Sequence, residues 1–261
     1  MFYIDDYILF RSGEIEIGIE TSTVEKIYSS QKDKLKKEYI AASSPRKKIT
    51  YNQFYIKKQL VTVNEFSKFI ADTSYITESE KDGWGWGWNN KWIKKEGVSW
   101  RTPFLDENDE YYISNAEIFP VMQVSWNDAA QYTNWLSITC GKEFRLPTEY
   151  EWEVLGNFAG VDSLIAMESG TYTKVDSDDD FIHTLEKKIM TSEFQLGLLW
   201  EWTLDWYKGY NDSIVNKDFG NIYKILRGGS LLSDSIQKSK EFRFRRCPTA
   251  RSPYYGFRVV C

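Results

Sequence analysis

The clearest alternation of hydrophobic and polar positions in this 261-residue chain lies between residues 119 and 152. Residues 120–124 alternate in character, which favours an extended run. From residue 126 the apolar positions recur at the spacing of a helix with one apolar face. Ser125 stands where an N-cap belongs, and Gly141 offers the left-handed conformation of a C-cap. The pattern therefore predicts an extended entry followed by a helix over residues 126–140.

Two further helices are predicted to begin at capping boxes, in which a threonine is followed three residues later by a glutamate. One box is formed by Thr148 and Glu151, after a short extended run at residues 145–147. The other is formed by Thr62 and Glu65, and apolar positions at helical spacing follow it.

The amino-terminal quarter of the chain is expected to be mostly extended. Residues 7–18 hold two short alternating runs around Ser12 and Gly13, which predict a β-hairpin. Residues 46–60 alternate β-branched and aromatic positions with polar ones, as strands do. Residues 21–44 are polar and rich in lysine, and we expect a loop with some helix there.

Three segments allow two structural interpretations each. The sequence GWGWGW at residues 83–88 could form an aromatic loop that stacks on a ligand, or it could fill an irregular core with glycines that allow close backbone approach. We favour the second. Residues 106–112 and the acidic cluster Asp176, Asp178, Asp179 and Asp180 could each offer carboxylates to a hard cation, but a solvated loop is the expected structure of both.

Composition narrows the class of protein. The chain is 42% hydrophobic and 16% aromatic, enough for a large core in one or two domains. Its net charge of −5 argues against nucleic acid as the main partner. No segment approaches the roughly 18 apolar residues of a membrane helix, and the amino terminus lacks the pattern of a signal peptide. Three widely spaced cysteines predict reduced thiols and a cytoplasmic location, and the oligomeric state stays open.

Five motifs together resemble those of the formylglycine-generating enzyme family, the sulfatase-modifying factors. They are V-S-W-x-D-A-x-x-Y-x-x-W-L at 124–136, R-L-P-T-E-x-E-W at 145–152, W-E-W-T-x-D-W-Y at 200–207, R-G-G-S at 227–230 and G-F-R at 256–258. The resemblance runs from about residue 7 to residue 260. It implies a single domain over residues 1–261 with an irregular α+β fold of the C-type-lectin-like kind and little regular secondary structure.

The residues that hold metals in this family differ here. Its working enzymes oxidise a cysteine of a client sulfatase to formylglycine with copper(I) on two cysteines after the R-G-G-S motif, where this chain has Ser233 and no cysteine up to residue 240. A second branch uses iron on three histidines, and His183 is the single histidine. The family's calcium motif keeps Gly197 and Glu201 but has Leu198 in place of asparagine, which argues against calcium. No catalytic residue and no cofactor are predicted.

The sequence therefore predicts a catalytically inactive member that binds a protein, a peptide or a small ligand, or that regulates a partner. An enzyme of the same fold with unrecognised, oxidoreductase-like chemistry and a retroelement-diversified lectin-like variable receptor are the alternatives. Arg243 and Arg245 alternate with Phe242 and Phe244, so internal ion pairs are a competing role for both arginines. The candidate ligand-binding residues are Ser230, Ser233, Asp234, Ser235, Arg243, Arg245, Tyr254, Tyr255, Trp84 and Trp86.

Overall fold

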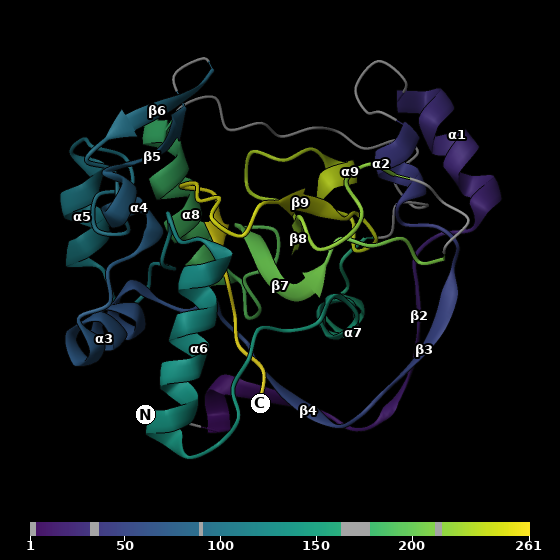
Figure 1. Cartoon of the computed structure of the whole chain (residues 1–261), viewed down its shortest axis with the longest axis horizontal. Helices are drawn as coiled ribbons and strands as arrows, with labels where there is room; N and C mark the ends of the chain where they lie inside the picture. The colour runs from purple at the N-terminus through teal and green to yellow at the C-terminus, as the bar shows by residue number, and fades with distance from the viewer. Residues whose placement is uncertain (1–3, 32–36, 89–90, 163–177, 212–215) are drawn as a thin grey trace.

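The computed structural model of the chain describes residues 4–31, 37–88, 91–162, 178–211 and 216–261. Helices and strands alternate irregularly along it. Figure 1 shows a small sheet in the middle, a group of helices on one side of it, and a long two-stranded arm with further helices on the other. The helical segments are η1 (Ile4–Asp6), α1 (Thr21–Gln31), α2 (Lys37–Ala41), α3 (Val63–Thr73), α4 (Glu78–Asp82), α5 (Asn108–Ser114), α6 (Trp126–Cys140), α7 (Glu149–Phe158), α8 (Asp178–Thr191) and α9 (Ser235–Lys238).

The central sheet is built from the last third of the chain. Its strand order is β10-β7-β8-β9, with β7 parallel to β10 and antiparallel to β8. The strands are β7 (Trp200–Trp206), β8 (Lys224–Arg227), β9 (Phe244–Arg246) and β10 (Tyr255–Gly256). Helix α7 packs against β7 and β8, and the largest buried cluster joins residues from Tyr7 to Val259. The mixture of helix and sheet confirms the expected α+β class.

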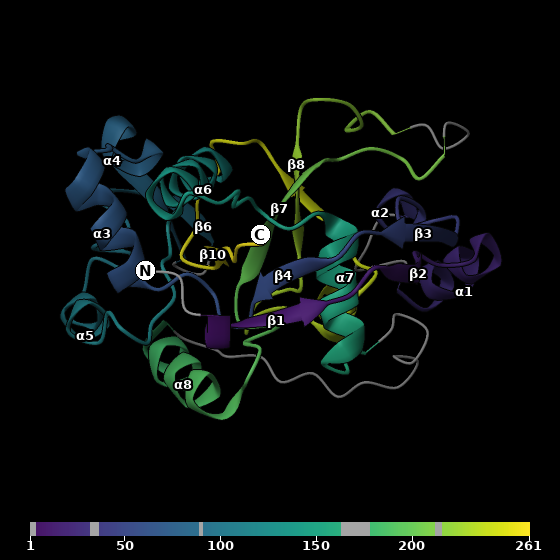
Figure 2. The ribbon, with the colours of Figure 1, turned by 90° about the horizontal axis from the view of Figure 1, so that it is seen from below.

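The predicted hairpin around Ser12 and Gly13 is wrong. Strands β1 (Tyr7–Phe10) and β2 (Gly13–Ile17) do not pair with each other but continue in one direction. They pair instead with β4 (Phe54–Lys57) and β3 (Lys47–Tyr51), so that β1 and β2 form one side of the long two-stranded arm and β3 and β4 form the other (Figures 1 and 2). This pairing lets both sides of the arm bury apolar side chains in a second cluster, which also takes in α7 and Val260.

All three predicted helix starts are confirmed. The side-chain oxygens of Thr62, Ser125 and Thr148 each accept a hydrogen bond from the third helical N–H, and the acidic residue at that position binds back to the cap. Thr77 forms a fourth capping box at α4. Gly141 ends α6 with a φ of 64°, the left-handed conformation that glycine adopts without strain.

Three other segments differ from expectation. The GWGWGW segment is a regular strand, β5 (Trp84–Trp88), paired with β6 (Trp92–Glu96). Residues 106–112 lead into α5 instead of forming an acidic loop, and residues 21–44 are more helical than predicted. In the acidic cluster, Asp178 begins α8, while Asp176 lies outside the described residues. Across the described ranges no helix has the length and apolar character needed to cross a membrane.

A tryptophan cleft as the candidate functional site

A cleft of about 550 Å³ opens between the β5–β6 hairpin and the chain that follows β9. Its walls come from segments more than 140 residues apart in the sequence, which the fold brings together. It combines indole rings, a phenol, three cations, one carboxylate and one thiol. The lining residues are Asp82, Trp84, Trp86, Trp92, Lys94, Arg246, Cys247, Thr249, Ala250, Arg251, Ser252 and Tyr255.

The hairpin wall follows from the alternation of tryptophan and glycine. Gly85 is buried on the inner face of β5, where a Cβ atom would lie 2.4 Å from Cγ1 of Val98. Only a glycine lets the strand lie this close to the core. Trp84 and Trp86 lie on the opposite face, half-buried, with their ring centroids 5.6 Å apart. Lys94 is directly across the ladder from Trp86, so a cation and indoles share one surface.

Arg251 ties the two walls of the cleft together. Its guanidinium is 2.6 Å from the carboxylate of Asp82, and it donates a hydrogen bond of 2.9 Å to the carbonyl of Trp84. The side chain of Arg251 is 3% exposed, whereas that of Asp82 is 44% exposed, so solvent reaches the ion pair from the Asp82 side. Arg251 and Lys94 also lie 4.0 and 3.9 Å from the centroid of the Trp84 ring, within the range of cation–π attraction.

The second wall carries Arg246 and Tyr255. Arg246 is exposed, lies 4.1 Å from the centroid of the Phe244 ring and donates to the carbonyl of Arg245. Burial raises the pKa of the Tyr255 phenol, and the nearby charge of Arg246 opposes part of that rise. Tyr255 therefore stays neutral and can donate a hydrogen bond across the physiological pH range.

Of the residues predicted from the sequence, Trp84, Trp86 and Tyr255 meet in this cleft. Tyr254 does not line it. Its ring packs at 4.9 Å from Phe181 and at 5.5 Å from Trp92, and it is 3% exposed.

The four predicted residues after the R-G-G motif lie elsewhere, and two of them are interior. Ser230 and Ser233 are buried, and the hydroxyl of Ser233 accepts a hydrogen bond of 3.0 Å from the N–H of Ser230. Asp234 is the N-cap of α9, which begins at Ser235, and its carboxylate accepts from the N–H of Gln237. These side chains hold a turn and a helix start instead of lining the cleft.

The two predicted arginines, Arg243 and Arg245, form internal ion pairs, which is the competing role that the sequence offered for them. The guanidinium of Arg243 binds both carboxylate oxygens of Glu149, at 2.7 and 2.9 Å, and Arg245 pairs with Asp218. Burial pushes the pKa of Glu149 upward, but Arg243 and Arg227 together hold it below its usual value. Buried charges are tolerated only when paired in this way, so these arginines stabilise the fold.

The remnant of the family's calcium motif does not fit a calcium ion. Glu201 is fully buried, and its two carboxylate oxygens accept hydrogen bonds of 2.5 and 2.9 Å from the guanidinium of Arg258. Gly197, the other retained residue, has a φ of 76° and forms a tight turn near the carbonyl of Gly228. Calcium needs several free oxygen ligands, and here an arginine already occupies the carboxylate.

The position of the family's copper site does not fit copper either. The buried Ser233 hydroxyl is engaged within its own turn, and hydroxyl oxygen is a hard ligand that copper(I) does not prefer. The cysteines Cys140, Cys247 and Cys261 are free thiols on other segments. Cys247 is exposed at the cleft, while the other two are half-buried.

Sequence reasoning pointed to Arg246 as a donor for carboxylates but missed Lys94, Cys247 and Arg251. A signal for Lys94 was present, because residues 84–88 and 92–96 both alternate and are separated by a short connection, as in a hairpin. The others sit in an irregular loop, whose approach to the hairpin is a tertiary contact.

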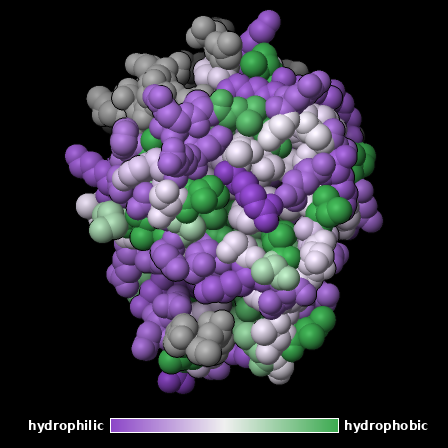
Figure 3. Space-filling view, turned by 90° about the vertical axis from the view of Figure 1, so that its left-hand side faces the viewer, coloured by the Kyte–Doolittle hydropathy of each residue, from purple (hydrophilic) through white to green (hydrophobic). Residues whose placement is uncertain are grey.

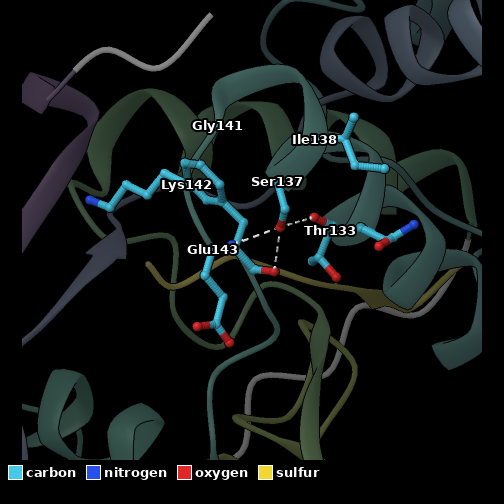
Figure 4. Close-up of a pocket in the computed structure, with 8 residues that line it drawn as sticks. Thr133, Ser137, Ile138, Gly141, Lys142 and Glu143 are labelled. Carbon is cyan, nitrogen blue, oxygen red and sulfur yellow. Dashed lines mark hydrogen bonds between the residues drawn. The ribbon is translucent and has the colours of Figure 1, made fainter.

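A second pocket lies at the carboxyl end of α6, between Thr133 and Phe144 (Figure 4). The Ser137 hydroxyl donates to the carbonyl of Thr133 and accepts from the N–H of Phe144, so it holds the turn after the helix. The face of the molecule that carries α3, α5 and the hairpin is mainly hydrophilic, with apolar side chains in separate small patches (Figure 3). The tryptophan cleft is the better candidate site, because it gathers more aromatic and charged side chains than the pocket at α6.

Comparison with curated proteins finds formylglycine-generating enzymes. The enzyme of Streptomyces coelicolor is 27% identical over 262 residues, which covers 83% of this chain and 81% of that protein. The mouse enzyme is 33% identical over 128 residues, 42% of this chain, and the match spans about a third of its length, 32%. The "Inactive C-alpha-formylglycine-generating enzyme 2" of Bos taurus is 27% identical over 258 residues, covering 83% of this chain and 79% of that protein.

Solved structures support the same fold. PvdO from Pseudomonas aeruginosa superposes with a TM-score of 0.62 at 16% identity, covering 97% of this chain and 93% of that one. The Treponema denticola variable protein 1 superposes with a TM-score of 0.57 at 14% identity, covering 98% and 94%. These likenesses show the C-type-lectin-like fold.

A family model described as the sulfatase-modifying factor enzyme 1-like domain matches residues 3–181 and 194–261. The matched ranges include the capped helices, the central sheet and both walls of the cleft. The chain therefore belongs to the family of sulfatase-modifying factor enzyme 1-like domains, with a C-type-lectin-like fold.

Proposed function

We propose that this protein is a non-catalytic binding module that takes a peptide segment of a partner protein into the tryptophan cleft. The observation that carries the proposal is the meeting of Trp84, Trp86, Trp92 and Tyr255 around one cavity of about 550 Å³. Aromatic side chains give large contact areas at a low cost in conformational entropy, which is why they dominate peptide-binding surfaces.

The residues at the family's metal positions support a non-catalytic role. The identity to relatives does not separate the two classes, because an enzyme and an inactive relative are both 27% identical to this chain. Ser233 supports the inactive class, since its hydroxyl stands where the enzymes have a copper-binding cysteine and is hydrogen-bonded within its own turn. We also propose a cytoplasmic location, because the three cysteines are free thiols, as is usual in a reducing compartment.

The test is selection from a random-sequence peptide display library on immobilised protein. The native protein should enrich specific peptides, and the variant Trp86→Ala should not, because it removes one wall of the cleft. Phe158→Ala is the matched control, since Phe158 is an exposed aromatic residue, 59% exposed, that does not line the cleft. Equal enrichment by native protein and Trp86→Ala, with equal melting temperatures, would overturn the proposed function.

A further inference from the structure

Hydrogen-bond donors without a partner gather in the tryptophan cleft. In the part of the chain that the structure describes, no acceptor pairs with the indole N–H of Trp84, Trp86 or Trp92, a property that they share with other indoles such as Trp100 and Trp152. The ammonium of Lys94 and the guanidinium of Arg246 likewise have no carboxylate partner among the described residues. A ligand that fills the cleft therefore meets mainly donors.

The acceptors of the cleft are largely engaged. Asp82, the one carboxylate of the lining, is paired with Arg251. The carbonyl of Trp84 accepts from Arg251, and the carbonyl of Trp86 accepts from the side-chain amide of Gln123 at 2.6 Å. A ligand rich in donors would leave the indoles and cations unsatisfied, which costs binding free energy.

The charge of the lining opposes that of the chain. The cleft carries three cations, Lys94, Arg246 and Arg251, against the single carboxylate of Asp82, a local balance of +2. The whole chain has a net charge of −5. A cationic cleft in an acidic protein selects anions locally and repels them elsewhere.

We propose, resting on the peptide-binding function above, that the cleft takes an acidic segment of a partner protein. One or two Asp or Glu side chains of that segment bind between Lys94 and Arg246. The carbonyl groups beside them accept hydrogen bonds from the indole N–H groups, and the apolar parts of the segment pack on the ring faces. The carboxylates thus pair with the cations, and the carbonyl groups accept from the indole N–H groups, so that both kinds of donor in the cleft gain an acceptor.

A short acidic segment fits this surface better than a nucleic acid does. Glu96 lies directly across the ladder from Trp84, and Glu78 lies one helical turn before Asp82. Neither of these glutamates has a cationic partner among the described residues, so both add negative charge beside the cleft and confine its favourable region for anions to the space between Lys94 and Arg246. A phosphate backbone needs a continuous track of cations, whereas one or two carboxylates need only the central pair.

The experiment uses the same peptide selection and reads the composition of the enriched sequences. Native protein should enrich Asp and Glu relative to the unselected library. The double variant Lys94→Gln with Arg246→Gln should still enrich peptides through its indoles, but without the acidic bias. Arg11→Gln with Lys187→Gln removes one arginine and one lysine from exposed positions outside the cleft, and it should keep the bias.

Affinity and location are then measured on one enriched peptide. Replacing its Asp and Glu by Asn and Gln should weaken binding about tenfold at low salt, and added salt should shrink the difference. The exposed thiol of Cys247 reports occupancy, because bound peptide should slow its alkylation by N-ethylmaleimide. Cys140 and Cys261, half-buried elsewhere, are internal controls whose rates should not change.

Each outcome has one meaning. Enriched peptides that are neutral or basic overturn the acidic specificity and leave the proposed function standing. No enrichment above that of Trp86→Ala overturns both. An oligouridylate that binds more tightly than the acidic peptide and protects Cys247 assigns the cleft to single-stranded nucleic acid and overturns the proposal.

Discussion

At the scale of single residues, buried arginines pair with several interior carboxylates of this protein. Arg258 binds both oxygens of Glu201 and also donates to the carbonyls of Lys57, Lys58 and Phe194. Removing one partner of such a buried pair leaves an uncompensated charge, which costs about 3–5 kcal/mol. The pair therefore makes Glu201 a structural residue.

The first prediction concerns Glu201 and calcium. Glu201→Gln should lower the free energy of unfolding by about 3–5 kcal/mol, because Arg258 loses its buried counter-charge. Calcium chloride or EDTA should leave the melting temperature of the native protein unchanged, since Arg258 occupies both carboxylate oxygens. A calcium-dependent rise in melting temperature that Glu201→Gln abolishes would contradict this assignment.

The second prediction concerns the pH dependence of stability. Asp205 accepts a hydrogen bond of 2.7 Å from the N–H of Glu149, and burial, with the charge of Glu149, raises the pKa of Asp205 to about 6. The folded state therefore holds this proton more tightly than the unfolded state, whose pKa is about 4. The stabilising contribution is complete below about pH 4 and is lost as the pH rises to about 6.

Urea unfolding at a series of pH values tests the Asp205 assignment. The stability of the native protein should fall by up to about 2 kcal/mol more than that of Asp205→Asn over this range. Asparagine keeps an acceptor for the N–H of Glu149 but does not titrate. Parallel curves for the two proteins would show that the pKa of Asp205 is not raised.

At the scale of elements, the helices are defined by their starts. Four helices begin with a complete capping box, at Thr62, Thr77, Ser125 and Thr148. Each box satisfies two backbone N–H groups that a helix terminus otherwise leaves without a partner. Helices that begin at a fixed residue present their apolar faces to the core at defined positions. The start of α6 beside β7 depends on the capping box at Ser125.

The third prediction is that Ser125→Ala destabilises the protein by about 0.5–2 kcal/mol, because the N–H of Asp128 loses its acceptor in a fully buried site. Thr62→Ala and Thr148→Ala should cost similar amounts. The control is Ser29→Ala, since Ser29 is exposed and its hydroxyl donates to the carbonyl of Glu25 within α1. Chemical denaturation that finds no difference between Ser125→Ala and this control would show that the cap contributes nothing.

At the scale of the whole molecule, the scaffold of the family is kept and its metal positions are altered. One buried cluster joins the amino-terminal arm, the helices and the central sheet, and the last residue, Cys261, exchanges backbone hydrogen bonds with Tyr55. The position of the first copper thiol holds Ser233 inside this scaffold. The only exposed thiol of the described cysteines, Cys247, lies at the tryptophan cleft instead.

The fourth prediction is that the protein does not convert the cysteine of a sulfatase peptide to formylglycine, even with copper(I) supplied. Copper(I) prefers soft thiolate ligands, and the Ser233 hydroxyl is hard, buried and hydrogen-bonded. Mass spectrometry of the peptide measures the product, and the formylglycine-generating enzyme of Streptomyces coelicolor is the positive control. Formylglycine in the sample with this protein would end the non-catalytic interpretation.

Much of the architecture could be predicted from local pattern. The starts of α3, α6 and α7, the end of α6 at Gly141 and the strand character of residues 46–60 all depend on neighbours in the sequence. The hairpin at Ser12 failed because strand pairing depends on which apolar faces share a core, and the β1–β4 partners are more than 40 residues apart. The strand at residues 84–88 was missed because alternating glycine resembles loop composition, although its period is that of a strand.

By itself, the sequence determined the family, the capped helices and the absence of a cysteine at the copper positions, because motifs, caps and ligand chemistry are local properties of residue type and spacing. Only the tertiary structure decided the roles of the candidate residues. It turned Arg243 and Arg245 inward onto Glu149 and Asp218, and it brought Trp84 and Trp86 to Tyr255 across most of the chain. Burial and long-range approach set those roles, because the same side chain is a binding group when exposed and an interior ion-pair partner when the fold removes it from water.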